Sequence, residues 1–312
     1  MTVLKLGLIV SIMAACSGQF AAIEPVQEVQ YEQFDGKRAW QDVDYQVSLG
    51  ARTPGSKAHS QTVRWIEERL RGLNWAVETQ EVPIAVGAET YTMKNITAKL
   101  GSGRPWLVIG AHYDSRFHAD RDADPNLRNT AVPGGNDGAS GVAVLLELGR
   151  VLPSYLLYPK ADSELRAQQI WLVFFDAEDN GQIEGWDWIL GSRAFVERLE
   201  DKPDAAVIVD MIGDSQLEIF KEQNSDPQLS QEIWDTAGAL GFAEWFIPEE
   251  KYRILDDHIS FIEAGIPAVD VIDFDYPFWH TTADTADKVS PESLDVVGDT
   301  LLHWLVYPLT ER

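Results

Sequence analysis

Helical and strand patterns alternate along most of this chain. The apolar residues Val63, Ile66, Leu70 and Leu73 recur at helical spacing, which predicts a helix over residues 60–73. Further helices are predicted over residues 141–152, 192–199, 228–240, 257–264 and 293–307. In the last of these, the residues expected to face inward are Val297, Leu301, Leu302 and Leu305.

Short apolar runs between the helices predict buried strands. Residues 76–83 and 91–98 alternate between apolar and polar side chains, as expected for antiparallel strands near a sheet edge. The fully apolar runs occupy residues 106–110, 170–175, 205–209 and 266–272. Because helices and buried strands alternate, we predict an α/β fold: a single domain with a mixed, mostly parallel central sheet flanked by helices.

Charged side chains follow three of these buried strands. His112 comes just after the first run, Glu178 and Asp179 follow the second, and Asp210 follows the third. An α/β sheet builds its chemistry at the carboxyl ends of its strands. Acids packed at the end of a buried strand also repel one another unless a cation or a shared proton compensates. We therefore expect a functional site at this edge of the sheet.

The mixture of carboxylates and imidazoles favours zinc. Zinc accepts histidine nitrogen and carboxylate oxygen, and catalytic sites keep one coordination position open. Five ligands can serve two ions if one carboxylate bridges them, and Asp137 is the expected bridge. Each residue alone has a structural alternative, such as a turn or helix cap at Asp137, so the joint pattern carries the prediction. The candidate ligands are His112, Asp137, Asp179, Asp210 and His280.

Glu178 is expected to act beside the metal instead of binding it. It is adjacent to Asp179, and neighbouring side chains on an extended or tightly turned segment point in different directions. Asp179 can then face the metal while Glu178 faces a substrate. A carboxylate beside other acids has a raised pKa, which suits a general acid/base.

A long polar loop lies between two of the candidate segments. Residues 116–135 contain few apolar side chains. Long loops in compact domains are usually functional or disordered. Since this loop connects the segments that hold His112 and Asp137, we expect it to border the substrate entrance.

Composition narrows the possible partners. The chain has 312 residues, with 50 acids, 25 bases and a net charge of −25. This balance argues against nucleic-acid binding, which requires a basic patch. Its one cysteine, Cys16, excludes an intrachain disulfide and any metal site built from several thiolates.

Residues 1–15 have the features of an export signal. Lys5 precedes an apolar run over residues 6–14, and small residues precede Cys16. This pattern resembles the lipobox of bacterial lipoproteins, in which the cysteine is lipidated; a plain cleaved signal with an incidental cysteine is the alternative. We expect a signal over residues 1–15, a tether over 16–35 and a zinc-dependent catalytic domain over 36–312. The protein would then be exported to the bacterial cell envelope and reach the membrane only through a lipid on Cys16.

Taken in order, the candidate segments resemble those of the co-catalytic zinc aminopeptidase family, which also contains the glutaminyl-peptide cyclotransferases. The resemblance covers about residues 45–310 and implies the predicted sheet-and-helix fold. It also implies peptide or protein N-termini as substrates. The segments are residues 112–115, 136–141, 178–179, 190–193, 210–213, 257–258 and 280–281.

The two branches of this family differ in their metals. The resemblance implies two zinc ions and all five ligands for an aminopeptidase, with Glu178 activating water. For a cyclotransferase it implies one zinc ion, at Asp137, Asp179 and His280, although residues matching His112 and Asp210 are retained. Asp179 stands where many members have glutamate, so its shorter side chain would shift the metal or require a backbone adjustment.

Three local features resemble the cyclotransferase branch. Asp256 stands where the peptidases usually have serine, and in cyclotransferases an acid there shares hydrogen bonds with the base; with Asp210 it would hold the proton network. Trp279 precedes the metal-binding histidine, as in cyclotransferases, and Tyr276 with its neighbours resembles their aromatic wall. Trp186 would form another side of the pocket, or else pack in the core.

The resemblance therefore implies a zinc-dependent glutaminyl-peptide cyclotransferase, which converts N-terminal glutamine to pyroglutamate and releases ammonia. A two-zinc aminopeptidase is the alternative. A non-catalytic binding domain on the same fold is a third possibility, which would be favoured if ligand positions were lost, and none of the five is lost.

Overall fold

A six-stranded sheet forms the centre of the catalytic domain. The computed structural model describes residues 31–87, 89–158 and 165–307. In this part of the chain the strand order is β1-β2-β4-β3-β5-β8. Strands β3, β4, β5 and β8 pair in parallel, whereas β2 pairs antiparallel with both β1 and β4. The strands are β1 (Ala76–Val86), β2 (Glu89–Gly101), β3 (Trp106–His112), β4 (Gln169–Phe175), β5 (Ala205–Asp210) and β8 (Ala268–Ile272).

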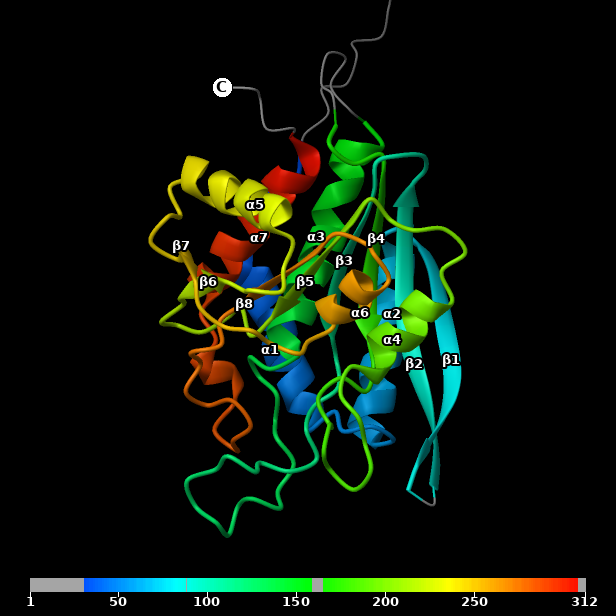
Figure 1. Cartoon of the computed structure of the whole chain (residues 1–312), viewed down its shortest axis with the longest axis vertical. Helices are drawn as coiled ribbons and strands as arrows, with labels where there is room; N and C mark the ends of the chain where they lie inside the picture. The colour runs from blue at the N-terminus through cyan, green and yellow to red at the C-terminus, as the bar shows by residue number, and fades with distance from the viewer. Residues whose placement is uncertain (1–30, 88, 159–164, 308–312) are drawn as a thin grey trace, which may run out of the picture. The chain divides into compact units, whose positions relative to one another are not determined.

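Helices cover both faces of this sheet (Figure 1). The larger apolar core lies between one face and five helices: α1 (Gly36–Leu49), α2 (Lys57–Gly72), α3 (Ala139–Leu156), α5 (Pro227–Ala239) and α7 (Pro291–Val306). A smaller core lies between the other face and two short helices, α4 (Leu190–Glu197) and α6 (His258–Glu263). The mixed, mostly parallel sheet between helices confirms the predicted fold class.

The strand β3 shows how the sequence supplies both cores. Successive side chains of a strand point to opposite faces of the sheet. Leu107 and Ile109 accordingly pack in the larger core, while Trp106 and Val108 pack in the smaller one. A strand buried on both faces has to be apolar at every position, which is why these strands are visible in the sequence as continuous apolar runs.

Helix starts follow local capping chemistry. The Asp226 and Ser290 side chains cap α5 and α7 by accepting hydrogen bonds from backbone N–H groups two or three residues ahead, and a proline follows each cap. Proline suits the first turn because it lacks an N–H that would otherwise need a partner. Ser56 caps α2 by accepting from the His59 N–H at 3.0 Å.

Helix α1 was not predicted from the sequence. Its buried face includes polar side chains, Asp42 and Gln46, so the apolar period is interrupted. Both have tertiary partners: Arg69 donates two hydrogen bonds to Asp42, at 2.9 and 3.0 Å, and Gln46 donates to the carbonyl of Ala139 at 3.1 Å. A local pattern cannot reveal partners that lie so far along the chain.

Residues 31–35, which the sequence assigns to the tether, pack against the domain. Phe34 is 7% exposed and its ring lies against Gly298, where a Cβ would come within 2.1 Å of the ring. Asp35 caps α1 by accepting from the Lys37 N–H at 2.9 Å. These described residues therefore belong to the same compact unit as the domain that follows them. Residues 1–30, with the predicted signal and Cys16, lie outside the described residues.

Two further elements lie at one side of the main sheet. Strands β6 (Ile219–Lys221) and β7 (Phe246–Glu250) form a small parallel sheet. They are short, and β7 is mostly exposed, so the sequence carried no clear strand signal there. Within the described residues, one helix, α3, is long and apolar enough to cross a membrane, but 78% of that stretch is buried in the protein core.

Candidate metal centre

The carboxyl ends of three adjacent parallel strands place the candidate residues together. β3 lies between β4 and β5, and it ends at His112. β5 ends at Asp210, and β4 is followed by Glu178 and Asp179 after a short turn. Asp137 precedes α3, which begins at Ala139. All these side chains are at most 9% exposed, so the predicted functional edge of the sheet is a buried polar cluster.

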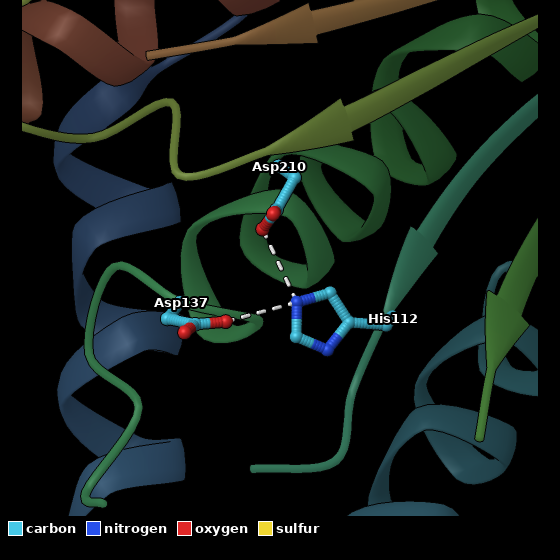
Figure 2. A group of neighbouring side chains, drawn as sticks. All are labelled: His112, Asp137 and Asp210. Carbon is cyan, nitrogen blue, oxygen red and sulfur yellow. Dashed lines mark hydrogen bonds and ion pairs between the residues drawn. The ribbon is translucent and has the colours of Figure 1, made fainter. Parts of the chain in front are cut away.

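Two groups of candidate ligands share Asp137. In the first, His112 Nε2 lies 3.2 Å from Asp137 Oδ1 and 3.1 Å from Asp210 Oδ1 (Figure 2). In the second, His280 Nε2 lies 2.8 Å from Asp179 Oδ1 and 3.8 Å from Asp137 Oδ2. The ligand atoms within each group are all within 4.8 Å of one another. Asp137 thus turns one oxygen to each histidine, which is the geometry expected of a bridging carboxylate.

The second group fits a zinc ion. Asp137 Oδ2 and Asp179 Oδ2 are buried and have no hydrogen-bond partner among the described residues. Buried polar atoms of this kind are rare in native proteins unless a water or an ion satisfies them. One imidazole nitrogen and two carboxylate oxygens form a donor set that zinc accepts, with a further position left for a substrate.

Burial and mutual repulsion disfavour the charged forms of these acids. Burial raises the pKa of Asp179 to about 6, with a further contribution from the charge of Asp137 and partial opposition from His280. Burial likewise raises the pKa of Asp210 to about 7, opposed by His112. A divalent cation bound between the carboxylates would remove this repulsion and return them to their charged forms.

Each histidine has a carboxylate near its other ring nitrogen. His112 Nδ1 lies 3.6 Å from Asp114 Oδ1, and His280 Nδ1 lies 3.5 Å from Asp120 Oδ1. Burial opposes charge on His280, but Asp179 and Asp120 outweigh it and raise its pKa to about 9. Such a carboxylate fixes the ring orientation and makes the Nε2 atom a better ligand. Neither Asp114 nor Asp120 was among the predicted site residues, although Asp114 lies within the segment that resembles the family.

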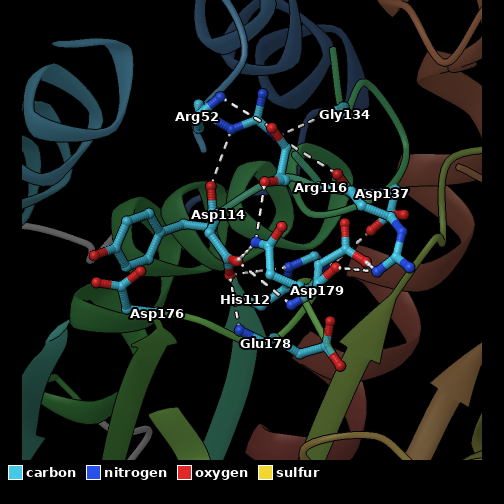
Figure 3. Close-up of polar contacts among 12 residues, drawn as sticks. Arg52, His112, Asp114, Arg116, Gly134, Asp137, Asp176, Glu178 and Asp179 are labelled. Carbon is cyan, nitrogen blue, oxygen red and sulfur yellow. Dashed lines mark hydrogen bonds and ion pairs between the residues drawn. The ribbon is translucent and has the colours of Figure 1, made fainter. Parts of the chain in front are cut away.

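Buried polar groups hold the backbone behind the ligands (Figure 3). The Asp114 carboxylate accepts hydrogen bonds from the Glu178 N–H at 3.1 Å and the Asp179 N–H at 3.4 Å. Arg116 donates to the Asp179 carbonyl at 2.7 Å. Arg52, fully buried, donates to the carbonyls of Tyr113 and Gly134 at 3.0 and 2.6 Å. The orientation of the ligands therefore depends on side chains from several distant segments.

The loop over residues 116–135 supports the ligands from behind. Arg116 and Asp120 belong to it, and the Arg121 guanidinium lies 4.1 Å from the centre of the Trp279 ring. None of its residues belongs to the described lining of the cavity in front of the ligands. The loop contacts His280 and Trp279 through Asp120 and Arg121, but it does not line the cavity itself, as the sequence had led us to expect of a loop at the substrate entrance.

Three residues at the centre adopt the left-handed backbone conformation that side chains other than glycine rarely take. They are Ala177 (φ 56°), Met211 (φ 48°) and His280 (φ 56°). Ala177 turns the chain between β4 and Glu178, while Met211 follows Asp210 directly. Strained backbone of this kind persists where the surrounding structure enforces it and clusters at functional sites. Here it coincides with the candidate ligands.

A cavity of about 250 Å³ opens onto the second ligand group. Its buried end carries carboxylates, including those of Glu178 and Asp256, and its sides include Trp188, Phe274 and Trp279. This volume is below the roughly 300–1,000 Å³ of pockets that hold drug-sized ligands. The cavity therefore suits one amino-acid side chain with its α-amine.

Two predicted pocket residues lie elsewhere. Trp279 lines the cavity, but Trp186 and Tyr276 do not. Trp186 is half-buried and packs against the rings of Tyr91 and Phe117, with centroids 5.3 and 5.6 Å away. The Tyr276 hydroxyl donates instead to buried Asp284 at 2.7 Å.

Trp188 takes the place predicted for Trp186. It lines the cavity and its ring is nearly parallel to that of His280, at 9° and 6.3 Å between centroids. The two tryptophans are separated by one residue in a loop, so spacing alone could not distinguish them.

Glu178 and Asp256 face the same cavity. Burial raises the pKa of Glu178 well above its usual value; His112 opposes the shift, and the charge of Asp256 adds to it. Asp256 is close in sequence to a buried cluster around His258. His258 Nε2 lies 3.2 Å from Glu222, and His258 Nδ1 lies 3.5 Å from Asp270. The sequence did not predict that Glu222 and Asp270 belong to this cluster. Asp210, predicted to share the proton network, lines the same cavity, and its carboxylate lies 3.1 Å from His112 Nε2.

Comparison with known proteins agrees with the fold and the predicted family. The model of the family described as peptidase family M28 matches residues 95–305, which is more than half of the chain. The chain belongs to this family. The predicted resemblance to zinc aminopeptidases and glutaminyl-peptide cyclotransferases is therefore confirmed.

Individual relatives come from both branches. A glutaminyl-peptide cyclotransferase of Gloydius blomhoffii is 27% identical over 307 residues, covering 85% of this chain and 79% of its own. The crystal structure of Porphyromonas gingivalis glutaminyl cyclase is 31% identical, with a TM-score of 0.79 and coverage of 88% and 98%. A leucine aminopeptidase precursor from Bacteroides thetaiotaomicron is 29% identical, with a TM-score of 0.80 and coverage of 91% and 100%.

Zinc binding at the second ligand group should stabilise the fold. A ligand at 100 times its dissociation constant stabilises by about 2.7 kcal/mol, so a chelator should lower the melting temperature of the wild type. His280→Ala should bind less zinc and lose most of this difference, because it removes the imidazole ligand. His118→Ala removes a histidine outside both ligand groups and serves as the matched control. Zinc content and thermal unfolding measure both effects; full zinc-dependent stabilisation in His280→Ala would contradict the assignment.

Proposed function

We propose that this protein is a zinc-dependent glutaminyl-peptide cyclotransferase that converts the N-terminal glutamine of peptides to pyroglutamate. The observation that carries the proposal is the convergence of Asp137, Asp179 and His280 at the buried end of a small cavity that also contains Glu178. Cyclotransferase relatives aligned over most of the chain support this choice within the family.

The reaction joins two groups of the same residue. The α-amine nitrogen of glutamine forms a bond to its side-chain amide carbon, and the bond from that carbon to the amide nitrogen breaks, which releases ammonia. A zinc ion held by Asp137, Asp179 and His280 would supply Lewis-acid polarisation of the side-chain carbonyl. No water is consumed, so a cavity that excludes water favours ring closure over hydrolysis.

Glu178 is the proposed proton carrier. Its carboxylate accepts a proton from the attacking amine and returns one to the departing nitrogen. Asp256 lies close enough to influence its charge, and it is proposed to hold Glu178 in position. Trp188 and Trp279 border the same cavity. Flat aromatic walls would hold the glutamine side chain in the bent conformation that brings the amine to the amide carbon.

A two-zinc aminopeptidase is the second candidate. The first ligand group favours it, because His112 Nε2 lies close to both Asp137 Oδ1 and Asp210 Oδ1, and these residues complete the five-ligand set. Under that alternative Glu178 would activate water, and the substrate would be any suitable N-terminal residue. The number of zinc ions per chain separates the two proposals.

Parallel assays test the proposed reaction. Purified protein should release ammonia from a Gln-initiated peptide and bind about one zinc ion per chain, because one ion suffices for the Lewis-acid role. It should not release free leucine from a Leu-initiated peptide. Leucine release with about two zinc ions would instead support the aminopeptidase.

Glu178→Gln should keep the metal and lose ring closure. General acid–base catalysis contributes about 10²–10⁴-fold, so ammonia release should fall by a factor in that range while zinc content stays unchanged. Asp256→Ala should also cripple ring closure with zinc retained. Glu184→Gln, an exposed change in the same loop, is the control and should behave as wild type. A fully active Glu178→Gln variant would remove Glu178 from the mechanism.

We also propose that the protein is exported and lipid-anchored on the bacterial cell envelope, with its domain joined to Cys16 by a tether that ends before Tyr31. The sequence of residues 1–16 supports this proposal. In a bacterial host, Cys16→Ser should move the protein from the membrane fraction to the soluble fraction, because no lipid can then attach at that thiol. Membrane retention of this variant would contradict the anchor.

A further inference from the structure

One arginine contributes to the lining of the cavity. Arg253 is the only lysine or arginine among the described lining residues. Its side chain is exposed, whereas the carboxylates of Glu178, Asp179 and Asp256 at the other end are at most 7% exposed. The cavity therefore has carboxyl groups at its buried end and a guanidinium at its mouth.

Arg253 is held in place by a neighbouring amide. Its Nη1 donates to Asn224 Oδ1 at 2.5 Å. The Asn224 amide nitrogen in turn donates to Glu222 Oε1 and to the Ile254 carbonyl, both at 3.0 Å. Asn224 is thus fixed on one side and presents its oxygen to the guanidinium. An orientation set in this way reduces the entropy lost when a ligand binds.

The guanidinium keeps most of its binding capacity. It carries five N–H donors, and within the described residues it forms no ion pair with a carboxylate. Arg104, by contrast, pairs with Asp201 and Asp204, and Arg150 pairs with two glutamates. Arg253 can therefore bind an external anion at the mouth of the cavity without breaking an ion pair.

We propose that Arg253 is a specificity-determining residue that binds a carboxylate of the peptide beyond its N-terminal glutamine. This inference rests on the proposed function. The positively charged amino terminus is drawn to the buried acids, the glutamine side chain occupies the space between the aromatic walls, and the rest of the peptide leaves past Arg253. An arginine binds a carboxylate through two parallel hydrogen bonds. The carboxylate can belong to an acidic side chain after glutamine or to the C-terminus of a short peptide.

Four peptides distinguish these sources. Gln-Glu-Ala amide, Gln-Lys-Ala amide and Gln-Ala-Ala amide vary the second side chain, and Gln-Ala-Ala with a free C-terminus adds only a terminal carboxylate. The wild type should process a carboxylate-bearing peptide with a kcat/KM about three- to tenfold above that of neutral Gln-Ala-Ala amide, as expected for a partly exposed ion pair. The gain should shrink in high salt. Which peptide shows it identifies the source of the carboxylate.

Charge reversal provides the decisive variant. Arg253→Met should abolish the gain, and Arg253→Glu should favour Gln-Lys-Ala amide instead. Arg64→Glu makes the same change in net charge at an exposed position outside the cavity lining, and it should keep the wild-type preference. Zinc content and thermal unfolding verify that each variant is folded, and the ratio of rates within one variant removes differences in overall activity.

Results in the wild type or in the variants can overturn the inference. One such result is a wild type that releases ammonia from all four peptides at equal rates. The others are an Arg253→Met variant with an unchanged preference and an Arg64→Glu variant that loses it as Arg253→Glu does. A wild type that releases no ammonia even from the neutral peptide would instead contradict the proposed reaction itself.

Discussion

Repulsion between buried carboxylates is the constraint on which this structure depends. Asp137, Asp179 and Asp210 meet at the ends of parallel strands with almost no exposure to water. Burial and like charge raise the pKa values of Asp179 and Asp210, whereas His112 and His280 lower the pKa of Asp137 despite its burial. A cation coordinated by these oxygens would compensate the electrostatic repulsion between them, so the same arrangement would form a metal-binding site. The oxygens of Asp137 and Asp179 that lack hydrogen-bond partners, together with the Nε2 atom of His280, would supply that coordination.

Polar groups of the surrounding fold hold the candidate ligands in their orientation. Asp114 receives the N–H groups of Glu178 and Asp179, and Arg116 binds the carbonyl of Asp179. Ala177 holds a left-handed conformation immediately before these residues. This strained turn lets the short side chain of Asp179 reach the candidate metal site beside His280. The side chains of Glu178 and Asp179, the proposed base and a candidate ligand, can therefore point in different directions although the residues are neighbours in sequence.

The sheet and most of the candidate ligands were predictable because both depend on short-range patterns. Continuous apolar runs mark strands buried on two faces, and the charged residues that end them are located by the same runs. Residues whose environment comes from distant segments were not accessible in this way: helix α1 buries Asp42 only because Arg69 pairs with it, and Arg52 is buried because four carbonyls accept its N–H groups. Trp186 and Trp188 belong to the same irregular loop, and only the path of its backbone decides which of them lines the cavity. A sequence period cannot predict that path.

The ionisable groups of the cavity relate this metal centre to the proposed substrate. Acids line the end where the substrate amine would bind, and Arg253 lies at the mouth. The proposed function requires that the carboxylates of Asp137 and Asp179 and the imidazole of His280 bind one ion together. X-ray absorption at the zinc edge of the purified protein tests that point most directly. The spectrum should show nitrogen and oxygen neighbours only, with one imidazole at about 2.0–2.1 Å and carboxylate oxygens at about 2.0–2.2 Å. A spectrum without imidazole scattering, or one that His280→Ala leaves unchanged, would contradict the account.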